Sequence, residues 1–388
     1  MFAALAVPFL ITAQDQSSAE GDNRGQTRYT IVDLGPVGPQ GAVLSVSKNG
    51  LAAGAALARD GVLHGALWLG TLKIDIGNPG LGGPNSEANG VSDTGVAGAA
   101  QSSETNTEDF CGFNFIGLPP SNTACVPFVL QNGVVKALHK LGGANGVANS
   151  INDSGVAVGW AETGVKEKNC LVSQFKPVAW KDGKIYELPT YKGDTDGIAA
   201  QINDKGQVVG ASGTCGGPFN PNGNYLLENH PVLWEKDGKE MKVIDLGNLG
   251  GAGGLAGNHA CALNNRGQVV GHSQLKNNST FHGFIWTKEK QMRDLGTLPG
   301  DQASLALGIN DPGTIVGASL QTPTSIAARA VIWRGDSNSS MVDLNTLIDG
   351  SSNLNLQLAF SINDRGEIVG LALNDKGEPH GFLAIPCP

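Results

Sequence analysis

His259 and His272 are the residues of this chain whose type and placement come nearest to acid–base or metal chemistry. An imidazole titrates near neutral pH and is the commonest metal ligand in proteins. Both residues interrupt a repeated pattern, whereas four other histidines keep to one position of it, which indicates a structural role: His64, His230, His282 and His380. The sequence predicts no metal site and no cofactor, with His259 and His272 as the alternative candidates for one.

Four of the six cysteines fall in three long links between predicted strands: Cys111, Cys125, Cys170 and Cys215. In an oxidising compartment such cysteines form disulfides. We expect the pairs Cys111–Cys125 and Cys170–Cys215, which is one of the three pairings that four cysteines allow. A zinc site is the alternative, and the absence of any C-x-x-C pair disfavours it. Cys261 is expected to be a buried apolar residue, and Cys387 to be free.

Carboxylates recur in two phrases, ND-x-G and DLG, so a ring of them could bind calcium. Their regular repetition fits turn and strand-end roles at least as well, because Asn and Asp accept backbone hydrogen bonds in tight turns. The chain contains no G-x-S-x-G, no H-E-x-x-H and no phosphate-binding glycine motif. The sequence thus gives no catalytic residues, and whether the protein is an enzyme stays open, with binding favoured over catalysis.

One short phrase returns seven times, for example SINDSGVAVGWA, QINDKGQVVGAS and GINDPGTIVGAS. Its turn glycines run from Gly50 to Gly366, and neighbouring ones are 45 to 61 residues apart. Such a period accommodates four short strands. In five units a tryptophan ends the third strand, as in HPVLW and HGFIW, and in four of these a DLG-like fourth strand follows. We call the four strands a, b, c and d; ND-x-G predicts a tight hairpin between a and b.

The two ends of the chain carry complementary parts of one unit. TRYTIVDLG near the start reads as strand d alone, and HGFLAIP at the end reads as strand c without a following d. The sequence therefore predicts an all-β, seven-bladed β-propeller of four-stranded blades, closed by pairing the N-terminal strand with the C-terminal blade. Such closure removes exposed sheet edges.

The b–c links are short in four units and long in three consecutive ones, roughly at residues 101–125, 162–175 and 213–229. All three should rise from one face on adjacent blades, and long loops on a rigid scaffold commonly carry function. Drift in surface loops is the alternative. We expect a binding surface there, formed by the aromatic residues Phe110, Phe113, Phe115, Phe219 and Tyr225.

Residues 1–13, MFAALAVPFLITA, are apolar and uncharged and are typical of the core of a secretory signal peptide. They lack the usual basic start, which a translation start further upstream would explain; a buried strand is the alternative. Residues 14–28 are expected to be a flexible leader, and residues 29–388 a single propeller domain. The stretch is too short for a transmembrane helix. The net charge of -9 disfavours nucleic acid as a partner.

Units such as HGFIW…MRDLGTLPG…ALGINDPGTIVGAS resemble the HAF-type extracellular repeats of bacterial secreted proteins, over about residues 29 to 385. The resemblance implies an extracellular or cell-envelope protein and supplies no catalytic residues. Tryptophan in the third strand is also similar to WD-repeat propellers, in architecture only. We expect a binding or interaction scaffold for a glycan or protein partner. The alternative is a propeller enzyme, a lyase or hydrolase, acting on extracellular polysaccharide.

Overall fold

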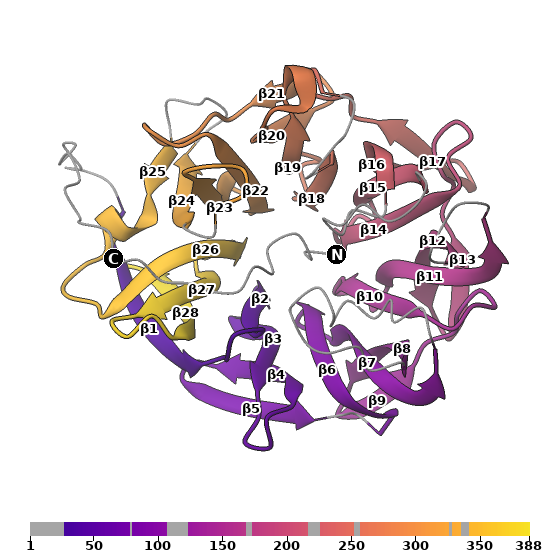
Figure 1. Cartoon of the computed structure of the whole chain (residues 1–388), viewed down its shortest axis with the longest axis horizontal. Coiled ribbons are helices and arrows are strands. Elements are labelled where there is room, and N and C mark those ends of the chain that lie inside the picture. Colours follow the sequence, from indigo (N-terminus) through magenta and orange to yellow (C-terminus); the bar gives the residue numbers. More distant parts are fainter. Residues whose placement is uncertain are drawn as a thin grey trace.

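The computed structural model describes residues 27–77, 80–106, 123–167, 173–215, 226–251, 257–325, 328–334 and 341–388. Within them the chain forms seven four-stranded antiparallel sheets arranged around a central axis, with the first strand of each sheet innermost (Figure 1). The predicted seven-bladed propeller is confirmed. No helix in these ranges is long and apolar enough to cross a membrane. The predicted signal peptide and nearly all of the leader lie outside the described residues.

The first three blades follow the order a, b, c, d along the chain. Blade one holds β2 (Ala42–Val46), β3 (Leu51–Leu57), β4 (Leu63–Leu69) and β5 (Leu72–Gly77). Blade two holds β6 (Gly82–Val91), β7 (Val96–Thr105), β8 (Thr123–Gln131) and β9 (Val134–Ala137). Blade three holds β10 (Gly146–Ile151), β11 (Ala157–Lys166), β12 (Ser173–Lys181) and β13 (Lys184–Glu187).

The next three blades repeat that order, with a short 3-10 turn added in blades five and six. Blade four holds β14 (Asp196–Ile202), β15 (Val208–Cys215), β16 (Leu226–Asp237) and β17 (Glu240–Asp245). Blade five holds β18 (His259–Leu263), β19 (Val269–Gln274), η2 (Lys276–Asn278), β20 (Phe281–Thr287) and β21 (Gln291–Asp294). Blade six holds β22 (Ala303–Ile309), β23 (Thr314–Leu320), β24 (Ala328–Arg334), β25 (Met341–Asp343) and η4 (Leu344–Leu347).

The seventh blade is built from both ends of the chain. It contains β26 (Leu354–Ile362), β27 (Ile368–Asn374) and β28 (Pro379–Pro386), and its outer strand is β1 (Tyr29–Pro36). β1 pairs antiparallel with β28, from Tyr29 opposite Pro386 to Pro36 opposite His380. Strand d of this blade therefore comes from the start of the chain.

A histidine–aspartate contact repeats between strands c and d and includes the closing blade. His282 Nδ1 lies 2.9 Å from Asp294 in blade five, and His380 Nδ1 lies 2.8 Å from Asp33 in blade seven. The other two pairs are His64–Asp75 at 3.0 Å and His230–Asp245 at 3.4 Å. The four repeated histidines are thus engaged by the fold, as their single repeat position indicated.

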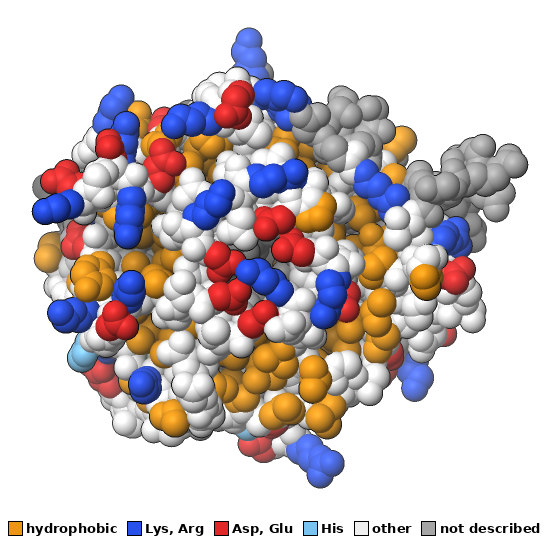
Figure 2. All heavy atoms as spheres, turned by 180° about the vertical axis from the view of Figure 1, so that it is seen from behind, with side chains coloured by type: hydrophobic (Ala, Val, Ile, Leu, Met, Phe, Trp, Pro, Cys, Tyr) orange, Lys and Arg blue, Asp and Glu red, His pale blue; other side chains and the backbone are white. Residues whose placement is uncertain are grey.

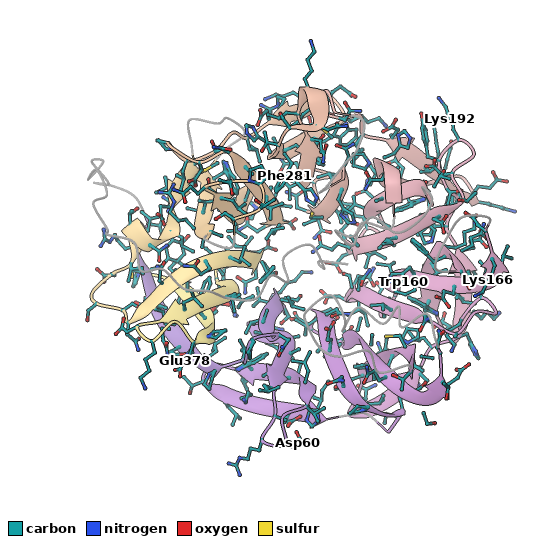
Figure 3. All side chains as sticks on the ribbon, viewed as in Figure 1. Asp60, Trp160, Lys166, Lys192, Phe281 and Glu378 are labelled. Atoms are coloured by element: carbon teal, nitrogen blue, oxygen red, sulfur yellow. The ribbon has the colours of Figure 1, made fainter. Side chains whose placement is uncertain are left out.

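The strand-c tryptophans lie between neighbouring blades and are almost completely buried: Trp68, Trp180, Trp234, Trp286 and Trp333. Trp234 Nε1 donates to the Pro189 carbonyl at 2.7 Å, just after the outer strand of the preceding blade. Trp68 makes the same bond to Leu34 of β1 at 3.2 Å. All five rings contribute apolar area, and four of them also donate one hydrogen bond to the preceding blade: Trp68, Trp180, Trp234 and Trp333. Figure 3 shows Trp160 and Phe281 among the side chains packed within the ring of sheets, while Lys166 and Lys192 lie at its outer rim.

A glycine in the middle of strand b lets two strands approach closely. A Cβ on Gly317 would lie 1.8 Å from the Leu305 carbonyl oxygen of strand a. Strand a has a register shift beside this contact, between Ala306 and Gly308. The V-G-x-S phrase therefore recurs because this crowded inner position excludes a side chain.

Candidate functional site

The five aromatic residues predicted to form a binding surface lie outside the residues that can be described: Phe110, Phe113, Phe115, Phe219 and Tyr225. The structure does describe where these long links begin and end. The flanking strands b and c are longer in blades two to four than in the other blades. β16 has 12 residues and β7 and β11 have 10 each, whereas β19 has 6. The long links therefore begin from extended hairpins on three adjacent blades, and binding by their tips stays a prediction.

His259 and His272 lie opposite each other on β18 and β19. Their rings stack with centroids 5.9 Å apart and planes inclined by 10°. The Cys261 sulfur lies 3.9 Å from His259 Nδ1 and 3.6 Å from His272 Nδ1. Burial lowers the pKa of His259 well below its usual value and raises the pKa of Cys261 to about 12. His259 and Cys261 are therefore neutral near pH 7.

Metal chemistry finds no support at this cluster. No three His, Cys, Asp or Glu side chains within the described ranges are arranged to hold a metal ion. Cys261 is buried and free, as expected, and Cys387 is free as well. Cys125 is buried on β8, but the side chains of Cys111, Cys170 and Cys215 cannot be described. The predicted disulfide pairing therefore remains a prediction.

The a–b turns form a hydrogen-bonded belt around the axis, on the face shown in Figure 2. The amide of each turn's aspartate donates to the corresponding side chain of the next blade: Asp93 to Asp153 at 3.0 Å, Asp153 to Asp204 at 3.1 Å. The belt continues through the links Asp204–Asn265, Asn265–Asp311 and Asp311–Asp364. The repeated aspartates thus connect neighbouring blades.

Lys48 stands in blade one at the repeat position of these aspartates. Its ammonium lies 2.7 Å from Asp153 and 2.5 Å from Asp204, which belong to blades three and four. The side chain therefore reaches across the axis. The bonds to Asp153 and Asp204 raise the pKa of Lys48. Figure 2 shows acidic and basic side chains gathered at the centre of this face.

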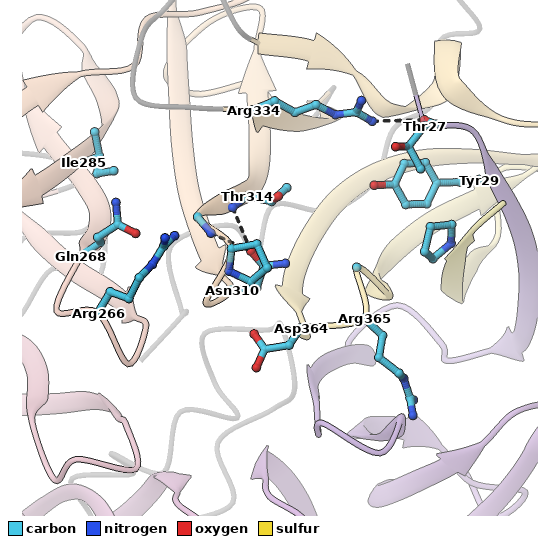
Figure 4. A pocket seen from close by; sticks show the side chains of 14 residues that line it. Thr27, Tyr29, Arg266, Gln268, Ile285, Asn310, Thr314, Arg334, Asp364 and Arg365 are labelled. Atoms are coloured by element: carbon cyan, nitrogen blue, oxygen red, sulfur yellow. Dashed lines mark hydrogen bonds between the residues drawn. The ribbon is translucent and has the colours of Figure 1, made fainter. Parts of the chain in front are cut away.

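A pocket of about 580 Å³ opens beside the belt, between blades five, six and seven (Figure 4). Blade five contributes Arg266, blade six contributes Thr314 and Arg334, and the closing blade contributes Tyr29 and Asp364. Its volume falls within the range of about 300–1,000 Å³ that is usual for small-molecule sites. It lies on the a–b turn side of the ring, whereas the long links start at the opposite ends of strands b and c.

The variable third residue of ND-x-G shapes this pocket. In blade six that residue is Pro312, with a short ring, whereas blades five and seven have Arg266 and Arg365. A Cβ on Gly313 would lie 2.7 Å from Arg266 Nη2, so the Arg266 guanidinium leans over the blade-six turn. Gly313 itself has a φ of +93°. Arg365 instead leans toward Gly50 of blade one and pairs with Glu367 at 2.6 Å.

The outer wall of the pocket is the seam where the chain ends meet. Tyr29 is 3% exposed, and its hydroxyl points toward Thr314 (Figure 4). Burial raises the pKa of Tyr29, so the phenol is protonated near neutral pH, while the adjacent Arg334 works against the shift. Arg334 Nη2 also donates to the Thr27 carbonyl at 3.1 Å. Ligand contacts at this wall would thus involve the closing strand directly.

Sequence reasoning did not identify this pocket. Arg266 and Arg365 appeared only as variable turn residues, and Arg334 simply follows a strand-c tryptophan. One signal was present: Pro312 lies between two turns with arginine at the same place. Nothing in the linear sequence brings Tyr29 beside Arg334, because their contact depends on ring closure.

Comparison with known proteins supports the fold only. No family model matches the chain, and neither does any curated protein. Among solved structures it is similar to a puromycin-hydrolysing peptidase of Mycobacterium tuberculosis, at 10% identity and a TM-score of 0.50. The match covers 90% of this chain and 55% of the peptidase, so this chain spans about half of that protein. At this identity the similarity establishes a shared propeller architecture.

Two further similar structures have lower TM-scores. The β-propeller domain of the Trilobed protease from Pyrococcus furiosus, described as having an open velcro topology, matches at 9% identity and a TM-score of 0.49. That match covers 92% of this chain and 93% of the domain. Trypanosoma rangeli sialidase matches at 10% identity and a TM-score of 0.39, over 92% of this chain and 54% of the sialidase. The seven four-stranded sheets themselves define the chain as a seven-bladed β-propeller.

Proposed function

We propose that this propeller is a binding protein of the extracellular space or cell envelope, and that the pocket between blades five and seven is its ligand site. The pocket is the observation that carries the proposal, because three blades contribute converging polar side chains to one concave site of about 580 Å³. The resemblance to HAF-type repeats supports the extracellular placement.

Binding is favoured over catalysis by the way the fold uses its reactive side chains. The repeated histidines contact strand-d aspartates, and the turn aspartates bond to neighbouring blades. In the His259–His272–Cys261 cluster, burial holds His259 and Cys261 neutral near pH 7. Of these groups only Asp364 lines the pocket, together with arginine, tyrosine, threonine and amide side chains. Such a lining positions a ligand without providing an evident nucleophile and base pair.

The test is a steric block with a matched control. Pro312→Trp places an indole over the pocket at an exposed turn position, and Ser154→Trp makes the same change at the equivalent position of blade three. The new Trp amide can donate to the Asn310 side chain, as the Ser154 amide donates to Asn152 at 3.1 Å. Both variants should therefore fold.

Wild type and both variants are applied to an array of acidic, neutral and basic oligosaccharides. We expect bound oligosaccharides to be lost with Pro312→Trp and retained with Ser154→Trp. Binding that survives Pro312→Trp would place the site elsewhere, with the long links of blades two to four as the next surface to shorten. Release of new reducing ends from any bound oligosaccharide would favour the lyase or hydrolase alternative.

A further inference from the structure

The pocket contains two guanidinium groups whose charge the protein does not neutralise. Across the described ranges, Arg266 and Arg334 have no carboxylate within ion-pair distance, whereas Arg329 pairs with Asp301 at 2.8 Å and Arg365 pairs with Glu367. In a chain of net charge -9, two such arginines at one concave site mark a place for an anion. A planar guanidinium matches a carboxylate through two parallel hydrogen bonds.

Neutral hydrogen-bonding groups lie between and beside the two arginines. Gln268 Oε1 accepts from Asn264 Nδ2 at 2.8 Å, which leaves the Gln268 amide NH₂ to donate. The Thr314 side chain also lines the pocket, and the Tyr29 hydroxyl points into it (Figure 4). These groups suit the hydroxyls of a sugar. The volume of about 580 Å³ is far more than a lone carboxylate or phosphate needs.

Asp364 makes one end of the pocket acidic. It lines the end next to the axial belt, and its Oδ1 accepts the Asp311 amide at 2.8 Å. A carboxylate there repels a second anion but accepts hydrogen bonds from hydroxyls. The lining thus fits a ligand with one carboxylate paired to one of the two arginines and hydroxyls directed to Asp364.

Other ligand classes fit this lining less well. Peptides are commonly bound by addition to an exposed strand edge, and the lining here consists mainly of turns and strand ends. A nucleobase needs an aromatic face for stacking, whereas the Tyr29 ring is only 3% exposed. This inference rests on the proposal that the pocket is the ligand site. We propose that the pocket binds a saccharide ending in a single uronate.

The experiment measures binding by isothermal titration calorimetry. The probes are a trisaccharide ending in glucuronate, the same trisaccharide ending in glucose, inorganic phosphate and an acidic hexapeptide. We expect the uronate probe to bind with an affinity that falls as salt rises, and to bind at least about 10-fold more tightly than the glucose probe. That factor reflects a charged hydrogen bond worth roughly 1.5–3 kcal/mol. Equal affinity for the glucose probe, or tighter binding of phosphate or peptide, would overturn the inference.

Variants locate the carboxylate. Arg266→Gln should weaken binding of the uronate probe by about 10-fold or more, because the Arg266 guanidinium is exposed over the pocket. That guanidinium makes no described contact across the seam, so its loss should not disturb ring closure. Arg334→Gln should also weaken binding, because it removes the second positive charge of the pocket, although it removes the bond to Thr27 as well. Arg365→Gln is the matched control: Arg365 also borders the pocket, but its guanidinium pairs with Glu367 and points away toward blade one. A loss with Arg365→Gln as large as with Arg266→Gln would contradict the assignment.

The two proposals fail in different ways. If some oligosaccharide is lost with Pro312→Trp but the uronate and glucose probes bind alike, the pocket remains the site and the uronate inference is wrong. If the uronate probe binds equally to wild type and Pro312→Trp, the site itself lies elsewhere and both proposals are wrong.

Discussion

Removing β1 should destabilise the whole ring, because that strand belongs to two hydrophobic clusters. Tyr29 packs with Leu344, Leu347 and Phe382, between blades six and seven. Leu34, which is 5% exposed, packs instead with Trp68 of blade one. The perturbation is a chain that begins at residue 35, and its control is a chain that begins at residue 27 and keeps the strand.

The expected loss follows from the buried side chains. Truncating a buried aromatic costs about 3–5 kcal/mol and a buried leucine about 2–5 kcal/mol. Tyr29 and Leu34 together therefore contribute roughly 5–10 kcal/mol, comparable with the roughly 5–15 kcal/mol that stabilises a typical domain. The Asp33–His380 contact and the Trp68 bond to Leu34 are lost as well. We expect the shortened chain to be unfolded or molten near room temperature.

Urea unfolding followed by tryptophan fluorescence gives the stability, and size-exclusion chromatography with light scattering gives the association state. A synthetic peptide of residues 27–36, added to the shortened chain, should pair with β28 and raise the urea midpoint of unfolding part of the way back to that of the control. Without it, the exposed β28 edge should promote association. A shortened chain that is monomeric with the midpoint of the control would refute the view that β1 holds the ring closed.

Three further outcomes are expected. Because burial lowers the pKa of His259 in the fold, the unfolded chain takes up the proton first; stability should fall as pH drops below about 6.5, and His259→Leu should flatten that slope in urea titrations at pH 5 to 7.5. Lys48→Met should cost no more than about 1 kcal/mol in the unfolding free energy, because the contact is partly exposed, and a loss that does not shrink at high salt would contradict this reading. Mass spectrometry of secreted, non-reduced protein should show the loop cysteines linked, and four free thiols would rule out the pairs Cys111–Cys125 and Cys170–Cys215.

The fold was predictable because each blade needs the same few residues. Asn264 shows why: its Oδ1 accepts the Arg266 and Gln268 amides, and its Nδ2 donates to the Asn310 carbonyl of the next blade. A residue with so many partners recurs in sequence, as does the strand-b glycine exemplified by Gly317. Seven copies of such constraints define the number of blades.

The pocket was not predictable for the opposite reason. Its distinctive residues occupy positions that the fold leaves free, such as Pro312 and Arg266 at the variable turn position. Its outer wall depends on Tyr29 meeting Arg334, a contact 305 positions apart in the chain that no local pattern encodes. The predicted aromatic surface on the long links was inferred from length and composition alone, which say nothing of how the tips pack.

The antiparallel pairing of β1 with β28 has a mechanical consequence. Tyr29 lies opposite Pro386, so the outward ends of both strands are at the same end of the seam. A force pulling the two termini apart would break the hydrogen bonds between β1 and β28 one pair at a time, starting at that end, instead of loading all of them together. The blade would therefore resist little tension applied through both ends, while tethering by one end would place no load on it. Because Tyr29 and Pro386 also line the pocket, a bound ligand would stabilise the pairing of these two residues, which breaks first.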